Sequence, residues 1–384
     1  MKNEKTNRRD FFKQAGATGL ALGAMTASSA ALGIKALKER IENPLPRWRG
    51  FNLQYFYMLN RGIHDPVEDH FCWISDWGFD FVRLPMDYRT WLVNKPKRGE
   101  QRTIEDIYKI DESTLEKIDT AVLFGEKHGV HVSLCFHRCP GFKTGGYRDE
   151  PFDLWKDQEA VDAIAFHWDL FAKRYKGIGA EKISFNLFNE APDFGDNFNG
   201  PIYKKAITPA VDAIRKTSSD RLIIADGALA GKIVVPELIP LGIHQSVHCY
   251  VPGSISHYKV DWMRNIEYWP DPVWPGAIDF EGYPWDREKL ALYFSPWKEL
   301  YKQGIGVHLG ETSGSHKLPH TIFLAWLRDV LEIFKDIHIG YALWDFIGAS
   351  NFGILDTDRS DVDYEDWYGH KLDRKMLNML QEIG

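Results

Sequence analysis

Two glutamates follow apolar, β-type runs in this chain of 384 residues. Glu190 stands in KISFNLFNEAPDF (182–194), and Glu311 ends GVHLGE (306–311). A polar side chain at the end of a strand either meets water or has a use, since burying it unpaired costs free energy. Two carboxyl groups about 5–5.5 Å apart can hydrolyse a glycosidic bond with retention of configuration. The glutamates therefore predict a glycosidase site, provided that the fold brings them together.

Other polar and aromatic groups end further β-type runs. A cation such as Arg83 keeps a nearby carboxylate ionised, and an amide such as Asn189 can hydrogen-bond a sugar hydroxyl. A single polar residue at a strand end is usually explained by water, so only their convergence favours function. His137, His248 and Tyr250 also end predicted strands and can orient carboxyl groups and hydroxyls. Trp344 can form a flat floor for a sugar ring. The remaining polar groups at strand ends are Asn52 and Asp226.

These groups are positioned by alternating strands and helices. The apolar face of residues 321–334 recurs with a 3.6-residue period, as does that of 287–301, and another amphipathic helix begins near Leu115 and ends near Gly129. Strict alternation predicts a parallel sheet covered by helices, and eight units predict an α/β fold of the (β/α)8 TIM barrel type. A doubly wound sheet is the alternative, but no glycine cluster follows the first strand. The eight predicted strands are 49–53, 79–85, 130–137, 182–190, 221–227, 244–250, 306–311 and 339–346.

The longest irregular insertion, residues 251–286, separates the sixth strand from its helix. It holds four tryptophans, which either wall a cleft or pack the insertion on itself. Trp155, in the loop after the third strand, has the same two interpretations. The tryptophans of the insertion are Trp262, Trp269, Trp274 and Trp285.

The first 45 residues are predicted to be an export signal and a short linker, leaving 46–384 as a single catalytic domain. Arg8-Arg9 with the following DFFK resembles a twin-arginine signal, and an uncharged Ala/Gly-rich run follows it. That run is too weakly hydrophobic for a comfortable membrane span, so we expect export to the periplasm or medium, without stable membrane insertion after signal removal. A membrane anchor and a disordered basic tail are the alternatives.

The composition of the chain limits the classes of molecule that it is expected to bind. The net charge is −7 and no Lys/Arg stripe is concentrated in one segment, which argues against nucleic acid. Aromatic residues make up 14% of the chain, and flat rings suit the faces of sugars as well as a core. Cys72, Cys135, Cys139 and Cys249 are scattered without a Cys-x-x-Cys pair, so we expect no metal and no cofactor. The expected partner is a polysaccharide or oligosaccharide, bound by a monomer.

At this point the chain resembles the retaining β-glycosidases of glycoside hydrolase family 5, over nearly all of its length after the leader. RGFNL and FDFVRLPM are similar to the family's first strand and arginine strand, and NLFNEAP to its Asn-Glu-Pro motif. HCY and VHLGE are similar to its His-x-Tyr and nucleophile motifs, and LWDFIGASNFGILD to its last strand. All eight positions shared by the family are filled: Arg83, His137, Asn189, Glu190, His248, Tyr250, Glu311 and Trp344.

The resemblance implies that Glu190 is the acid/base and Glu311 the nucleophile of a double displacement. It also implies an endo-acting hydrolase of a β-1,4-linked glucan, with β-mannan or a decorated glucan or glycoconjugate as alternatives. The chain departs from the family at Ala191, which precedes Pro192, at Thr312, and at Asp345-Phe346. These departures leave the chemistry in place and affect the choice of substrate.

Two other classes compete with this interpretation. A metal-dependent barrel hydrolase needs clustered ligands, and HDPVEDH (64–70) has the residue types. However, Asp65-Pro66 there is typical of a helix cap and first turn. A catalytically inactive carbohydrate-binding barrel usually lacks one carboxylate, whereas this chain keeps both. Activity in the presence of a chelator, and hydrolysis rather than binding alone, distinguish these classes from a retaining glycosidase.

Overall fold

The computed structural model describes residues 43–95, 100, 103–144, 150–192, 200–264, 266–348 and 351–384. The predicted export signal and linker lie outside these ranges except for residues 43–45. Contacts divide the chain into residues 1–41 and a second compact unit, residues 42–384, to which all of the described structure belongs.

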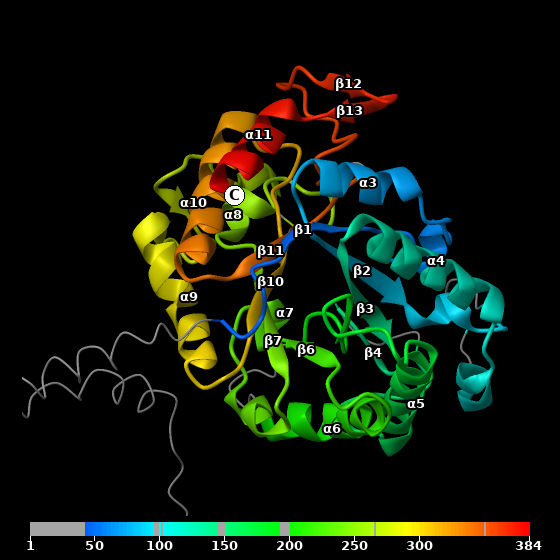
Figure 1. Cartoon of the computed structure of the whole chain (residues 1–384). Helices are drawn as coiled ribbons and strands as arrows, with labels where there is room; N and C mark the ends of the chain where they lie inside the picture. The colour runs from blue at the N-terminus through cyan, green and yellow to red at the C-terminus, as the bar shows by residue number, and fades with distance from the viewer. Residues whose placement is uncertain are drawn as a thin grey trace, which may run out of the picture. The chain divides into compact units, whose positions relative to one another are not determined.

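Eight parallel strands close into a barrel, which confirms the predicted TIM fold (Figure 1). Each strand pairs with two parallel neighbours in the order β2-β1-β11-β10-β7-β6-β5-β3, and a β2–β3 pairing closes the ring. The eight predicted strands all occur. Their bounds are β1 Arg49–Asn52, β2 Phe81–Asp87, β3 His131–Cys139, β5 Ile183–Asn186, β6 Leu222–Asp226, β7 His244–Cys249, β10 Val307–Thr312 and β11 Gly340–Leu343.

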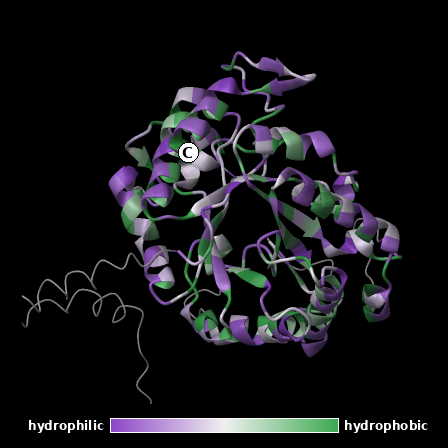
Figure 2. Ribbon diagram, in the orientation of Figure 1, coloured by the Kyte–Doolittle hydropathy of each residue, from purple (hydrophilic) through white to green (hydrophobic). Residues whose placement is uncertain are grey.

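Helices surround the barrel and bury one side each. The two predicted amphipathic faces are buried in α9 and α10, and Gly129 ends α4 in the left-handed region. Figure 2 shows apolar and polar residues on the same helices, as expected for helices that cover a sheet. The long helices are α3 Glu68–Asp76, α4 Glu112–His128, α5 Gln158–Arg174, α6 Gly200–Thr217, α9 Arg287–Tyr301, α10 His320–Asp336 and α11 Arg374–Ile383.

The structure departs from the sequence prediction in three places. After β6 the chain forms only α7 (Ala228–Gly231) and a 3-10 turn, Pro236–Leu241, because Pro236 and Pro240 prevent a longer helix. The fourth predicted strand stops at Asn186, four residues before Glu190. Helix α3 begins at Glu68 with Val67 as its N-cap, so the interpretation of Asp65-Pro66 as a cap and first turn was wrong.

The amino-terminal ends of the strands are closed by stacked rings. The imidazole of His131 lies 3.8 Å from the ring of Trp48 and 5.6 Å from that of Phe81, measured between ring centroids. The ring of His308 lies 4.4 Å from that of Phe81. Burial lowers the pKa of both histidines to about 3, so they are neutral at this end of the barrel.

Smaller elements decorate the barrel. A short strand, β4 (Phe142–Lys143), pairs antiparallel with the end of β3. The insertion carries α8 (Gly253–Ser256) and a small hairpin, β8 (Ala277–Ile278) with β9 (Pro284–Trp285). A second hairpin, β12 (Glu365–Trp367) with β13 (His370–Leu372), precedes α11. Within the described residues, we find no helix with the length and apolar character that a membrane crossing requires.

Candidate active site

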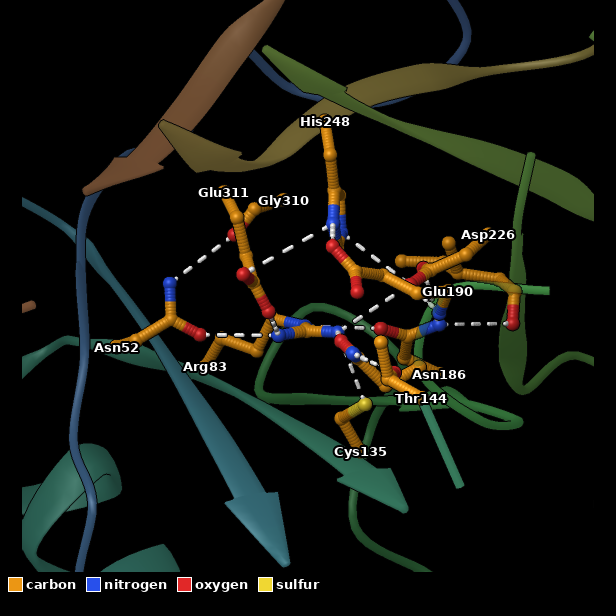
Figure 3. Close-up of polar contacts among 12 residues, drawn as sticks. Asn52, Arg83, Cys135, Thr144, Asn186, Glu190, Asp226, His248, Gly310 and Glu311 are labelled. Carbon is orange, nitrogen blue, oxygen red and sulfur yellow. Dashed lines mark hydrogen bonds and ion pairs between the residues drawn. The ribbon is translucent and has the colours of Figure 1, made fainter. Parts of the chain in front are cut away.

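Arg83 organises the carboxyl end of the barrel from a fully buried position on β2. Its Nη1 donates to Glu311 Oε1 at 2.6 Å (Figure 3), and its Nη2 donates to Asn189 Oδ1 at 2.8 Å. A buried guanidinium is stable only when paired and fully hydrogen-bonded. Its other partners are Asn52 Oδ1, Asn186 Oδ1, Cys135 Sγ and Asp226 Oδ2.

Glu311 lies on β10 where the ladder to β7 shifts register, and only 3% of its surface is exposed. The hydroxyl of Tyr250 donates to Glu311 Oε2 at 3.1 Å. Burial raises the pKa of Glu311 above its ordinary value, while the positive charges of His248 and Arg83 act in the opposite direction. The sequence-based expectation that Arg83 keeps this carboxylate ionised therefore describes one contribution, which burial outweighs.

Glu190 reaches the mouth by a backbone turn rather than along a strand. Beyond β5, Leu187 N still donates to Ile224 O and Asn189 N to Phe136 O. Glu190 then adopts φ = 50°, a left-handed conformation that is uncommon for a residue with a side chain. Its N–H donates to Asp226 Oδ2 at 2.9 Å, which holds the turn. Such backbone strain is concentrated at functional sites.

His248 joins the two glutamates to Asp226. Its Nδ1 lies 3.1 Å from Glu190 Oε1 and 3.9 Å from Glu311 Oε2, and its Nε2 lies 3.2 Å from Asp226 Oδ2. Burial alone would lower the pKa of His248, but the carboxylates of Asp226 and Glu311 raise it to about 10. The ring is therefore an imidazolium. The pKa of Asp226 falls despite its burial, because His248 and Arg83 are cations.

Two glycines make room for the His248 ring. A Cβ on Gly231, where φ is 75°, would lie 2.7 Å from His248 Cγ. A Cβ on Gly310 would lie 2.3 Å from Ser246 Oγ and 3.1 Å from His248 Nε2. At Gly231 the His248 ring occupies the space that a side chain would need, whereas at Gly310 the Ser246 hydroxyl occupies it and the ring lies close behind.

A cleft of about 420 Å³ lies above the glutamates. Trp344 and His137 line it, with ring centroids 5.5 Å apart, and Tyr57 meets both rings edge-on. Burial lowers the pKa of His137 well below its usual range, so it stays neutral. Tyr250 also lines the cleft, and burial with the adjacent Glu311 raises its pKa well above the usual range. Asn189 instead hydrogen-bonds within the protein, since its Nδ2 donates to Thr144 Oγ1.

The tryptophans of the insertion have different environments. Trp262 lines the cleft and is 56% exposed. Trp274 and Trp285 are buried and donate to Asp329 and Asp279, while Trp269 packs against Phe280. Trp155 contacts the rings of Phe142, Phe188 and Tyr203 and is not part of the described cleft lining. One tryptophan therefore walls the cleft, and the other four pack against the protein.

A model of the family described as Cellulase (glycosyl hydrolase family 5) matches residues 39–350. The chain belongs to glycosyl hydrolase family 5. Its curated relatives include Endoglucanase C of Acetivibrio thermocellus, 24% identical over 76% of this chain and 87% of that protein. Another is Cellodextrinase A of Ruminococcus flavefaciens, 24% identical over 68% of this chain and 73% of that one. As a member of this cellulase family, the protein is an endoglucanase-like glycosidase.

Solved structures agree with the family 5 assignment. A crystal structure described as a glycoside hydrolase is 34% identical, covers 88% of this chain and 99% of that chain, and superimposes with a TM-score of 0.80. Thermotoga maritima Cel5A in complex with cellobiose is 21% identical, with coverage of 88% and 97% and a TM-score of 0.66. The likeness to Cel5A supports the fold alone.

Several groups of the family 5 site had no role assigned from the sequence. Asp226 and Asn52 end predicted strands, but nothing in the sequence shows that both contact Arg83. Asn186 and Cys135 lie inside strands and look like core positions. Asp345 lines the cleft beside Trp344 and accepts a hydrogen bond from Gln54, and burial raises the pKa of its carboxyl well above the usual range.

Metal binding needs consideration, because oxygen and nitrogen atoms of Glu190, His248 and Glu311 lie within 4.8 Å of one another. The chemistry of this cluster is unfavourable for a cation. His248 is itself positively charged, and Arg83 already neutralises Glu311 at 2.6 Å. A metal ion would have to displace both cations or accept their repulsion.

Proposed function

We propose that the chain is a retaining endo-β-1,4-glucanase, with Glu311 as nucleophile and Glu190 as acid/base. The observation that supports it is the approach of a carboxylate oxygen of Glu190 to within 4.8 Å of one from Glu311. Retaining enzymes place the two carboxyl groups about 5–5.5 Å apart, whereas inverting enzymes leave room for a water at roughly 6.5–9.5 Å.

In the first step, Glu311 attacks the anomeric carbon while Glu190 protonates the departing glycosidic oxygen. The donors on Glu311, Arg83 Nη1 and Tyr250 Oη, hold its carboxylate in one orientation. A covalent glycosyl ester forms on Glu311, and the C–O bond to the leaving sugar breaks.

In the second step, Glu190 accepts a proton from water, and that water attacks the anomeric carbon from the opposite face. The ester to Glu311 breaks, which restores the starting carboxylate and retains the configuration of the sugar. Asp226 supports this role by accepting a hydrogen bond from the Glu190 N–H, and His248 by contacting the Glu190 carboxyl.

For the substrate, the relatives favour a glucan, since they include endoglucanases and a cellodextrinase. β-Mannan is the second candidate, because a structure of the similar Cel5A is described as a complex with mannotriose. Hydrolysis of a panel of β-glucans and β-mannans, with analysis of product lengths, tests both. Release of only short units from chain ends would contradict endo action.

Azide rescue tests the two roles directly. Glu311→Ala leaves space on the nucleophile's face, so azide and an activated β-glycoside should give the α-glycosyl azide. Glu190→Ala still forms the covalent intermediate when the leaving group needs no proton, and azide should then give the β-glycosyl azide. Exchanged products would reverse the roles, and inversion by the unaltered enzyme would exclude the mechanism.

We further propose that residues 1–45 direct export through the twin-arginine pathway and that residues 46–384 suffice for catalysis. Expression in a bacterium with this pathway should place the enzyme in the periplasm or medium, and Arg8→Lys with Arg9→Lys should retain it in the cytoplasm. Unchanged export of the double variant would contradict the signal type. A chain beginning at residue 46 should remain active but be less stable than one beginning at residue 43, because it lacks the hydrogen bonds between Asn43 and Val307 and the buried side chain of Leu45.

A further inference from the structure

Two cations line the cleft without a carboxylate partner. Arg61 is exposed beyond β1, and Lys232 is half-buried directly after α7. No other described residue forms an ion pair with either side chain, although the protein carries a net charge of −7. Other described cations, such as Lys204 and Lys298, also form no ion pair with a described residue, but Arg61 and Lys232 line the same cleft as Glu190 and Glu311.

The two cations flank the glutamates from opposite sides. Arg61 follows β1 and Lys232 follows β6, and these strands stand four positions apart in either direction around the ring of eight. The guanidinium of Arg61 lies 5.4 Å from the ring centroid of Tyr57, which contacts Trp344. On the other side, the residue before Gly231, Ala230, donates its N–H to the carbonyl oxygen of Ala191, next to Glu190.

Neighbouring groups do not cancel these charges. Burial raises the pKa of Asp345 well above its usual range, which favours its neutral form beside Arg61. Burial and the charge of Lys232 lower the pKa of His257 to about 4, so His257 is neutral too. The site holds four cations, Arg61, Lys232, Arg83 and His248, and four carboxyl groups, Glu190, Glu311, Asp226 and Asp345, and burial favours the neutral form of Asp345.

We infer that the natural substrate is an acidic glycan, with anionic substituents on sugars on both sides of the bond that is cleaved. The identity of the sugar backbone rests on the proposed β-glucanase function, whereas the preference for anionic substituents does not. Two cleft cations that form no ion pair within the described structure attract anionic groups on a bound polymer and so favour it over a neutral one. Carboxylate, sulfate and phosphate groups share this chemistry.

The test compares kcat/KM on hydroxyethylcellulose, carboxymethylcellulose and cellulose sulfate of matched substitution. The unaltered enzyme should have a higher kcat/KM on a charged polymer than on the neutral one. Whichever of carboxymethylcellulose and cellulose sulfate gives the higher kcat/KM identifies carboxylate or sulfate as the better ligand. Arg61→Gln and Lys232→Gln should each reduce that preference about two- to fivefold, because each removes one partly exposed charge pair. Raising the salt concentration from about 20 to 300 mM should reduce it as well.

Lys298→Gln, an exposed lysine of α9, is the matched control and should leave the preference unchanged. A role of Arg61 only in holding Tyr57 would lower kcat/KM equally on neutral and charged polymers. An unchanged preference in the double variant, or one insensitive to salt, would overturn the inference. If no cellulose derivative is cleaved, the glucanase proposal fails. In that case, tighter binding of an acidic mannan or xylan than of its neutral counterpart would still support the preference for anionic glycans, and equal binding would contradict it.

Discussion

The two ends of the barrel bury histidines in opposite charge states. At the amino-terminal ends of the strands, burial among aromatic rings lowers the pKa of His131 and His308 to about 3. At the carboxyl ends, His248 is equally buried, yet its pKa is raised to about 10. The difference is that Asp226, Glu190 and Glu311 lie within 4 Å of His248, whereas no carboxylate contacts the other two rings within the described structure.

Burial therefore does not decide charge by itself. Desolvation penalises the charged form at both ends, and only close opposite charges reverse the outcome. The amino-terminal end is filled by neutral rings that stabilise the barrel by packing. At the carboxyl end, each buried carboxylate or cation is stabilised by a neighbouring group of opposite charge. Each of the following changes should disturb one end and spare the other.

The largest effect is expected for Arg83→Met. Glu311 and Asp226 would lose one of the two cations that contact them, with only His248 left, which costs about 3–5 kcal/mol of unfolding free energy. We also expect kcat/KM to fall by roughly 10²–10³. Urea unfolding and hydrolysis kinetics measure both. Arg374→Met, which removes an exposed pair with Glu365, should cost less than about 1 kcal/mol. Equal losses in the two variants would contradict the ranking.

His248→Gln should lower the free energy of unfolding by a few kcal/mol, on the order expected for a pKa shift of this size. Below pH 6.5 the proton is bound in both the folded and unfolded chain, and the stabilisation is fully present. Between about pH 6.5 and 10 only the folded state keeps it, so the stabilisation declines as the pH rises. The difference from the unaltered enzyme should thus shrink towards pH 10, and a constant difference would exclude a charged His248.

Tyr250→Phe removes a donor from Glu311 without removing a charge. The pKa of Glu311, already raised by burial, should rise further, since its ionised form loses a hydrogen bond. The acid limb of kcat/KM should move to higher pH by less than about one unit, with a loss of less than about tenfold at pH 6. Tyr293→Phe on α9 is the control and should leave the profile in place.

The smallest effect should come from the closed end. His308 has a lowered pKa, so the unaltered protein loses stability as the pH falls from about 6.5 towards 3. His308→Gln should remove about 1–2 kcal/mol of this acid sensitivity and leave kcat/KM at pH 7 unchanged. Urea titrations at pH 7, 5 and 4 would show it. A pH trend of the same sign as for His248→Gln would contradict the contrast between the ends.

The strands were predictable because their apolar runs are short and regular and end in polar residues. Glu190 and Glu311 could be paired from the sequence, since the carboxyl ends of parallel strands meet at one face. Asn186 and Cys135 could not, because strands of a parallel barrel are buried on both faces and no alternation marks the interior. Their contacts with Arg83 depend on the order of strands around the ring.

The local backbone conformation of the site was the other feature that the sequence did not predict. The sequence places Glu190 on a strand, but in the structure it lies in a left-handed turn held by Asp226. This turn depends on a residue 36 positions away, so no local pattern predicts it. The tryptophans of the insertion illustrate the same limit. Trp262 and Trp274 lie only 12 residues apart in one irregular segment, yet Trp262 lines the cleft and Trp274 is buried against Asp329.

The two glycines around His248 have a consequence for protein engineering. Directed evolution of substrate range usually randomises residues near the cleft, and Gly231 and Gly310 are attractive targets because a glycine has no side chain that takes part in the reaction. A side chain at Gly231 would have to displace the imidazole from between its carboxylates, and one at Gly310 would have to displace the Ser246 hydroxyl that lies beside the imidazole. Libraries that vary these positions should return glycine at both, while Trp262, which lines the cleft and is 56% exposed, should accept many residues.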